Sequence, residues 1–114
     1  KLFFRVSRLF SRELGNNMTV YFVSRHEGAV AWIKQQPQWQ VDVFVRHLNP
    51  ADIAVGDVVL GTLPLHLAAE VCARGAMFYF LTLPQTADGR GLEYSAEEMQ
   101  QMGCGLQRFE VRAL

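Results

Sequence analysis

The sequence predicts an α/β fold: a single Rossmann-like domain of three layers, with a mostly parallel sheet of about five strands and helices on both faces. Short β-branched and aromatic runs alternate along the chain with segments of helical periodicity, as in parallel strands joined by crossover helices. The chain has 114 residues, of which 50% are hydrophobic, so it can build one core but not two. The clearest unit is 57–75, in which an apolar run, a glycine break and a helical repeat follow one another.

The net charge of the chain limits the classes of ligand that it is expected to bind. Lys and Arg together number 11, as do Asp and Glu, so the formal net charge is zero. Long nucleic acid needs a broad basic surface and is not expected, whereas one or two placed cations can hold a small phosphorylated ligand. Cys72 and Cys104 lack metal-ligand spacing and are expected to be free thiols of a cytoplasmic protein. No apolar run approaches the length of a membrane span, so no membrane partner is expected.

Residues 1–17 differ from the rest of the chain, because their apolar side chains share one helical stripe and three arginines lie opposite. This pattern fits a membrane-surface helix, an arginine-rich targeting segment or a helix that docks on a partner. We favour a fourth interpretation, in which Met18 is the native start and residues 1–17 are non-native or upstream sequence. The predicted domain is then 18–114.

The first predicted strand is 19–24, and the helix that follows it ends before Pro37. The loop between them carries Ser24, Arg25 and His26, which are a hydroxyl, a guanidinium and an imidazole. These side chains suit a binding or catalytic site. The alternative is structural, with Ser24 capping the helix and Arg25 in solvent.

The second predicted strand is 41–46, where valines alternate with other residues, and His47 ends it. The turn 49–52 follows. Asp42 and His47 are candidate ligand contacts. The alternative is a polar pair satisfied by backbone groups at the strand ends.

The unit 57–75 gives the third strand and the second helix. This helix is expected to begin at Pro64 or Leu65 and to end near Gly75 in a left-handed conformation. Its first backbone N–H groups have no partner within the helix, so this end attracts phosphate.

One face of the second helix carries His66, Glu70 and Arg74, which lie four residues apart. His66 is the candidate for function, because it lies in the first turn, near the end that attracts anions. A solvated charge ladder is the alternative for all three residues.

The fourth predicted strand is 77–83, and the loop after it carries Arg90 between two glycines, where the side chain can fold over a bound anion. A capping box at Ser95 begins the third helix, and Gly103 ends it. The closing strand is 106–111, where apolar and polar residues alternate.

The candidate site follows from the order of these elements. If the first and third strands are neighbours, their helices lie on opposite faces, and the crevice between them is the topological switch point at which such sheets bind ligands. The predicted lining comes from the two loops after these strands: Ser24, Arg25 and His26 on one side, and Gly61, Thr62, Pro64 and His66 on the other.

The side chains of this crevice suit a phosphodiester. Glycine-rich nucleotide-binding motifs are missing, and the histidines lie on separate elements without a carboxylate at ligand spacing, so neither cofactor nor metal is expected. Ser24 lacks the GxSxG context of a hydrolase. An arginine, a histidine and helix-end amides can neutralise a phosphodiester and stabilise its transition state. If the substrate is RNA, its 2′-hydroxyl can attack, and the protein needs neither nucleophile nor metal.

Four segments together resemble the Csx-sixteen family, small CRISPR-associated proteins of type III systems. They are SRHEGAVAW, VDVFVRHL, GDVVLGTLPLHLAAEVCARGA and RGLEYSAEEM. The resemblance runs from Met18 to about Val111, in line with Met18 as the native start. It implies a CARF-like Rossmann fold and a ring nuclease that degrades cyclic oligoadenylate, chiefly cyclic tetra-adenylate, and so switches off antiviral signalling.

The resemblance also implies metal-independent cleavage to short linear adenylates with 2′,3′-cyclic phosphate ends, in a homodimer whose two crevices meet across a two-fold axis. Within this activity, Arg25 would stabilise the scissile phosphate, and His26 or His66 would transfer a proton. The other expected ligand contacts are Ser24, His47, Gly61, Thr62, Leu63, Pro64 and Arg90, of which the last would close from its loop.

Two alternatives stay open. A binding module could hold the cyclic nucleotide in the same crevice without cutting it, and recovery of the intact ring after denaturation would indicate this. An interaction subunit of the CRISPR machinery, with a vestigial crevice, is the second. Absence of ligand binding together with co-purification of a protein partner would favour it.

Overall fold

The structure, a computed structural model, describes residues 18–83 and 93–114. The strands are β1 (Val20–Val23), β2 (Val43–Val45), β3 (Val58–Gly61), β4 (Met77–Thr82) and β5 (Gly105–Phe109). The helices are α2 (Glu27–Lys34), α3 (Leu65–Ala73) and α4 (Ala96–Met102), with a 3-10 turn, η1, at Pro50–Asp52. The predictions for residues 1–17 and for Arg90 lie outside the described residues.

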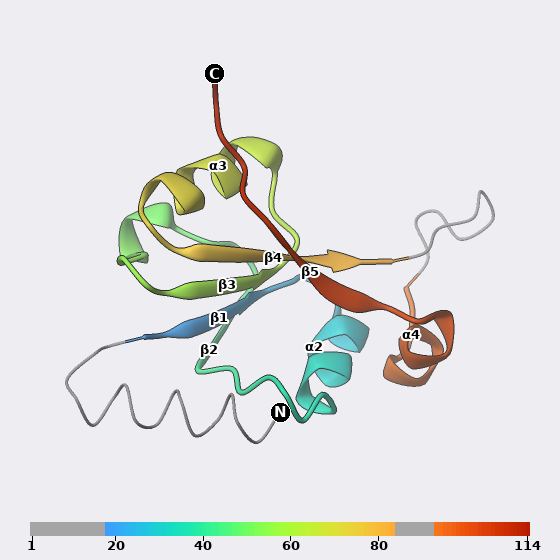
Figure 1. The fold of residues 1–114 in the computed structure, drawn as a ribbon. Coiled ribbons are helices and arrows are strands. Elements are labelled where there is room, and N and C mark those ends of the chain that lie inside the picture. The colour runs from blue at the N-terminus through green and yellow to red at the C-terminus, as the bar shows by residue number, and fades with distance from the viewer. Residues whose placement is uncertain (1–17, 84–92) are drawn as a thin grey trace.

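A five-stranded sheet of order β2-β1-β3-β4-β5 forms the middle layer of the domain (Figure 1). β1 pairs in parallel with β2 and with β3, and β3 pairs in parallel with β4. β5 runs antiparallel to β4. The predicted α/β fold with a mostly parallel sheet is therefore confirmed.

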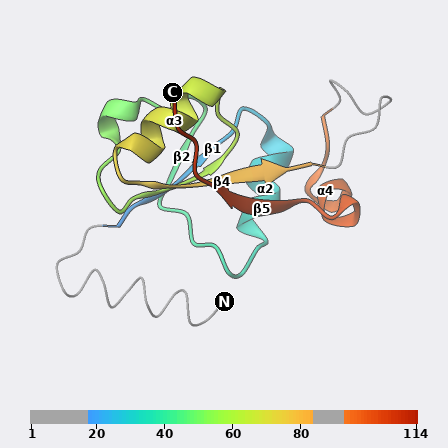
Figure 2. The same ribbon diagram turned by 45° about the horizontal axis from the view of Figure 1, so that its top comes forward.

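Helices cover both faces of the sheet, as predicted. α3 lies on one face, and α2 and α4 lie together on the other (Figures 1 and 2). The chain after β5 runs beside α3, where the N–H of Val111 donates to Sγ of Cys72 over 3.4 Å. Cys72 and Cys104 are free thiols. In the two described ranges, no helix is long and apolar enough to cross a lipid bilayer.

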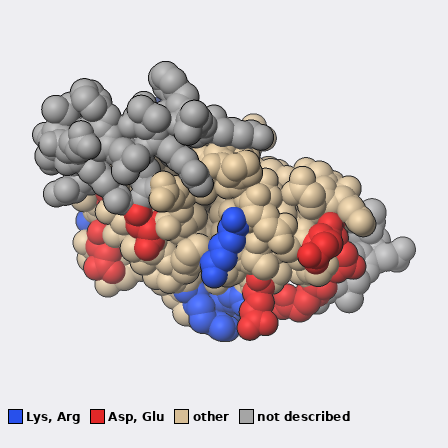
Figure 3. Space-filling model, turned by 90° about the horizontal axis from the view of Figure 1, so that it is seen from below, with Lys and Arg blue, Asp and Glu red and all other residues tan. Residues whose placement is uncertain are grey.

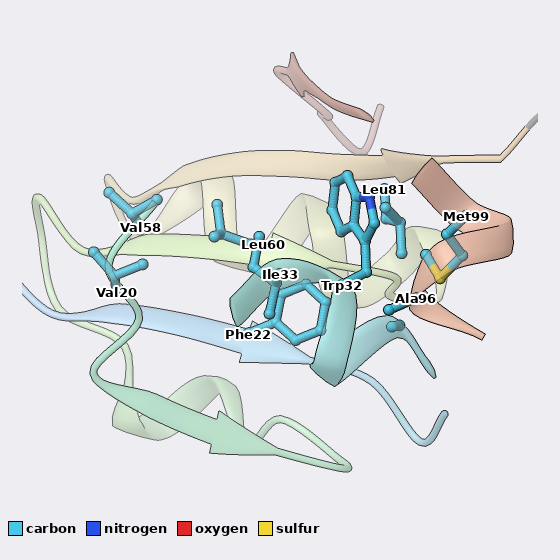
Figure 4. Packing of buried hydrophobic residues seen from close by; sticks show 10 residues of the cluster. Val20, Phe22, Trp32, Ile33, Val58, Leu60, Leu81, Ala96 and Met99 are labelled. Atoms are coloured by element: carbon cyan, nitrogen blue, oxygen red, sulfur yellow. The ribbon is translucent and has the colours of Figure 1, made fainter. Parts of the chain in front are cut away.

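Each face of the sheet has its own hydrophobic cluster. On the side of α2 and α4, Trp32 and Ile33 pack with Phe22 of β1 and Leu60 of β3, and none of the four is more than 2% exposed (Figure 4). Under α3 lies a second cluster, to which β3 contributes Val59. β1 and β3 are buried on both faces, and this is why their sequences are continuous apolar runs without alternation.

Hydrogen bonds fix β1 beside β3, the central strand of the sheet. The register of the pair places Val23 opposite Gly61. At the other end of the pair, the side chain of Asp57 is buried, and its carboxylate accepts from the N–H of Thr19 at 3.1 Å and of Ala54 at 2.9 Å. This buried carboxylate is satisfied by backbone donors and ties the starts of the two strands together.

The predicted helix ends are confirmed. α3 begins at Leu65, and Gly75 follows its end with a φ of 88°. At the start of α4, Ser95 and Glu98 form the predicted capping box, and Gly103 ends the helix with a φ of 76°. Local sequence signals were sufficient for these boundaries, because each depends on residues within one turn of the helix.

Both edge strands are shorter than predicted. β2 spans three residues instead of 41–46, and β5 ends at Phe109 instead of 111. Before β2, the carboxylate of Asp42 accepts from the N–H of Val20 at 2.8 Å, and the N–H of Asp42 donates to the carbonyl of Val20 at 2.8 Å. Asp42 thus bonds to backbone groups, which was the structural alternative to a ligand contact.

We predict that Gly61→Ala destabilises the domain more than Gly56→Ala. Both glycines have positive φ, 123° and 88°, so both substitutions introduce a backbone strain of about 1–3 kcal/mol. A Cβ at Gly61 would also overlap the carbonyl oxygen of Val23, whereas a Cβ at Gly56 meets no heavy atom within 4 Å. Urea unfolding of the two variants measures the difference, and equal losses of unfolding free energy would contradict this account.

Candidate functional site

A hollow of about 430 Å³ opens at the carboxyl ends of β1, β2 and β3. We call it the strand-end hollow. Its lining comes from the segments at these strand ends, 23–26, 46–48 and 62–64, with Leu67 added from α3. Because α2 follows β1 on one face of the sheet and α3 follows β3 on the other, the hollow lies at the topological switch point. The predicted crevice is therefore present.

Ser24 shapes the first loop of the hollow. Its side chain is buried, and its N–H donates to the carbonyl of Val45 at 3.0 Å, which continues the pairing of β1 with β2. Its hydroxyl accepts from the N–H of His26 at 3.1 Å. His26 is the N-cap residue of α2, so Ser24 does not cap the helix but forms the turn before it. This turn leaves the side chains of Arg25 and His26 exposed at the hollow.

The third loop of the hollow depends on Gly61. The N–H of Thr62 donates to the carbonyl of Val23 at 3.3 Å, so the chain stays close to β1 as it leaves β3. Thr62, Leu63 and Pro64 line the hollow, as predicted. Gly61 was also a predicted contact, but it is buried in the sheet and lies outside the lining. Its role is to let two backbones approach each other.

His66 does not lie in the strand-end hollow, and this part of the prediction is corrected. It lines a separate hollow of about 360 Å³ between α3 and the C-terminal segment 110–113. An α-helix turns about 100° per residue, so Leu67 faces the strand-end hollow while His66, one residue earlier, faces elsewhere. On the same face, Glu70 and Arg74 form an ion pair at 3.6 Å, in line with the charge-ladder alternative.

Two functional candidates were missed from the sequence. Arg46 lines the strand-end hollow beside His47, at the end of β2. A signal for it existed, because it is the last residue of a strand predicted to lie in the same parallel sheet. Glu93 had no such signal, since 67 residues separate it from its partner His26.

His26 and Glu93 form the closest polar side-chain contact at this edge of the described structure. Nδ1 of His26 lies 2.7 Å from Oε1 of Glu93, and the two side chains are 56% and 68% exposed. A carboxylate accepts but does not donate, so in the neutral imidazole the proton belongs on Nδ1. Nε2 is then the ring atom that can take a proton from a ligand.

The strand-end hollow is biased toward anions. Two arginines and two histidines line it, and no carboxylate does so among the described residues. Neither Arg25 nor Arg46 forms an ion pair with a residue that the structure describes. In the view of Figure 3, the basic side chains of the described residues lie across the middle of the face and at its lower margin, with acidic side chains beside them. The lining of the hollow therefore suits a small anion.

The described residues at the hollow do not form a metal-binding set. Within 18–83 and 93–114, no three His, Cys, Asp or Glu side chains lie close enough together to hold a metal ion. The lining carries guanidinium and imidazole N–H groups and the hydroxyls of Ser24 and Thr62, and these donor types suit phosphate oxygens.

Comparison with known proteins identifies a family for most of the chain. Residues 21–112 match the model of a family described as "Putative CRISPR-associated protein (Cas_VVA1548)". This range includes all the residues that line the strand-end hollow. Neither a curated protein nor a solved structure matches the chain.

We predict that Arg25→Ala and Arg46→Ala each weaken the binding of inorganic phosphate by about 10-fold or more, since each removes a charge-assisted hydrogen bond. Titration followed by NMR shifts of backbone amides in the loops of the hollow measures the affinity. Arg74→Ala is the matched control, because Arg74 pairs with Glu70 outside the hollow. Equal affinities in all three variants would show that phosphate does not bind here.

Proposed function

We propose, on the premise that this chain belongs to that family of CRISPR-associated proteins, that it is a ring nuclease of type III systems. It degrades cyclic oligoadenylate, chiefly cyclic tetra-adenylate, and so ends the antiviral signal that this messenger carries. The observation that supports the proposal most directly is the strand-end hollow, whose described lining combines two arginines and two histidines without a carboxylate. The motifs that resemble the Csx-sixteen family supply the choice of substrate.

The proposed reaction is transesterification within the RNA. The 2′-oxygen of one ribose attacks the adjacent phosphorus, and the bond from phosphorus to the 5′-oxygen of the next ribose breaks. The 2′-hydroxyl loses a proton, and the leaving 5′-oxygen gains one. The products are a 2′,3′-cyclic phosphate and a 5′-hydroxyl, so the ring opens without an external nucleophile or a bound metal.

His26 is the proposed base of this reaction. Its Nδ1 faces Glu93, which leaves Nε2 to take the proton from the 2′-hydroxyl. His47 comes to the same hollow from the end of β2 and is the proposed acid for the 5′-oxygen. His66, in the other hollow, has no part in the mechanism.

Arg25 and Arg46 would bind the non-bridging oxygens of the scissile phosphate. Charge on these oxygens rises as phosphorus becomes five-coordinate, so guanidinium groups bind the transition state more strongly than the ground state. Thr62 is an exposed residue of the same lining, and its hydroxyl would donate to the same phosphate.

A homodimer is the proposed working unit. A cyclic tetranucleotide has rotational symmetry, and a two-fold axis through its centre relates two phosphates. Two chains that share this axis would present two strand-end hollows to the ring.

We predict that the wild-type chain converts cyclic tetra-adenylate to linear adenylates with 2′,3′-cyclic phosphate ends, and that excess EDTA leaves the rate unchanged. The attacking group belongs to the substrate, so chelation removes nothing from the proposed reaction. Chromatography of the labelled ring, run against rings of other sizes, identifies substrate and product. Intact ring recovered after denaturation would indicate sequestration, and no binding at all would favour an interaction subunit.

We predict that His26→Ala lowers kcat by about 10²–10⁴-fold, the usual contribution of a general base. Arg25→Ala is expected to lower it by about 10²–10³-fold through lost charge stabilisation. His66→Ala is the matched control and should retain the wild-type rate, since His66 lines the other hollow. Unfolding curves verify that the variants fold, and full activity of either His26→Ala or Arg25→Ala removes that residue from the mechanism.

A further inference from the structure

A second hollow, of about 590 Å³, shares a wall with the strand-end hollow. Arg25 and Arg46 line both, so the two hollows are neighbours on either side of these arginines. We call the second one the glutamate hollow, because three carboxylates line it. Its described lining is Arg25, Glu27, Gly28, Arg46, Glu93, Tyr94, Ser95 and Glu98.

The glutamate hollow is formed where the start of α2 packs against the segment that leads into α4. A Cβ at Gly28 would overlap the carbonyl oxygen of Tyr94, so the two backbones are in direct contact. The capping box then fixes the next residues, since Ser95 and Glu98 exchange hydrogen bonds of 2.9 and 3.1 Å. The position of the hollow is thus set by backbone packing and not by flexible side chains alone.

The two hollows differ in charge. The strand-end hollow has cations and, among the described residues, no carboxylate, so it suits a phosphate. The glutamate hollow adds three carboxylates to the same two arginines, so a second phosphate would be repelled there. A neutral group that carries N–H donors suits it better, because carboxylates only accept hydrogen bonds.

Among the three carboxylates, only that of Glu27 has neither oxygen bonded to a described residue. Oε1 of Glu98 accepts from the N–H of Ser95, and Oε1 of Glu93 contacts Nδ1 of His26. Glu27, at the exposed start of α2, forms no hydrogen bond or ion pair with a described residue. Arg25 and Arg46, which line both hollows, do not form an ion pair with Glu27 either. Opposite charges that line one hollow without pairing leave both kinds of group for a bound molecule.

We propose that the glutamate hollow is a nucleobase subsite that selects a base with an exocyclic amino group. This inference rests on the proposed ring nuclease function. In a nucleotide the base and the phosphate are joined through one ribose, so a phosphate in the strand-end hollow brings its base to a neighbouring site. The 6-amino group of adenine donates to the carboxylate of Glu27, and the half-buried ring of Tyr94 provides a surface for the base.

The test compares two cyclic tetranucleotides, cyclic tetra-adenylate and its analogue built from unsubstituted purine, which lacks the amino group. Wild-type protein should prefer the adenylate ring by about 10-fold or more in kcat/KM, the effect of one hydrogen bond to a charged acceptor. Glu27→Ala should bring this ratio close to one. Glu97→Ala is the matched control, because Glu97 is also an exposed glutamate in the first turn of a helix but lies outside the hollow.

The outcomes separate this inference from the function on which it rests. If the wild-type chain cleaves both rings equally, or if Glu27→Ala keeps the full preference, the base subsite is wrong and the ring nuclease stands. If neither ring is cleaved, calorimetric affinities for the two rings replace kcat/KM in the same comparison. If neither ring binds, both proposals are overturned.

Discussion

The pairing of β1 with β3 is the constraint on which the rest of the site depends. These strands are parallel neighbours, yet their helices pack on opposite faces of the sheet, so the chain diverges where the two strands end. Neither helix covers the space between the two strand ends, and this space is the strand-end hollow. Gly61 allows the close approach, because a side chain there would overlap the backbone of β1. The carboxylate of Asp57 secures the other end of the same pair.

The strand-end hollow and the glutamate hollow differ in charge because different segments of the chain line them. The loops after β1 and β2 bring the cations. The carboxylates come from Glu27 at the start of α2 and from Glu93 and Glu98 around the start of α4. A net charge of zero for the whole chain is therefore compatible with a locally basic hollow. A nucleotide has the complementary pattern, since its phosphate is anionic and its base offers neutral donors. The proposed substrate and the proposed subsite are consistent with this single arrangement.

Most of the fold could be predicted from the sequence, because its signals are local. The β-branched runs of β1 and β3, the glycine that ends α3 and the capping box of α4 each act within a few residues. The edge strands were less predictable. An edge strand pairs with a neighbour on one side only, so side chains can replace some of its backbone hydrogen bonds. The carboxylate of Asp42 does this before β2, where it accepts from the N–H of Val20. The length of such a strand is decided by neighbours and not by its own pattern.

The sequence by itself determined the kind of fold, the switch-point crevice and the loop residues Ser24 to His26 and Thr62 to Pro64 that line it. The loops that follow parallel strands lie at the same edge of the sheet, because strand direction places them there independently of side-chain orientation. Only the tertiary structure decided that His66 faces away and that Glu93 meets His26. The direction of a helical side chain depends on the rotation of the packed helix, and a contact across 67 residues depends on the whole fold.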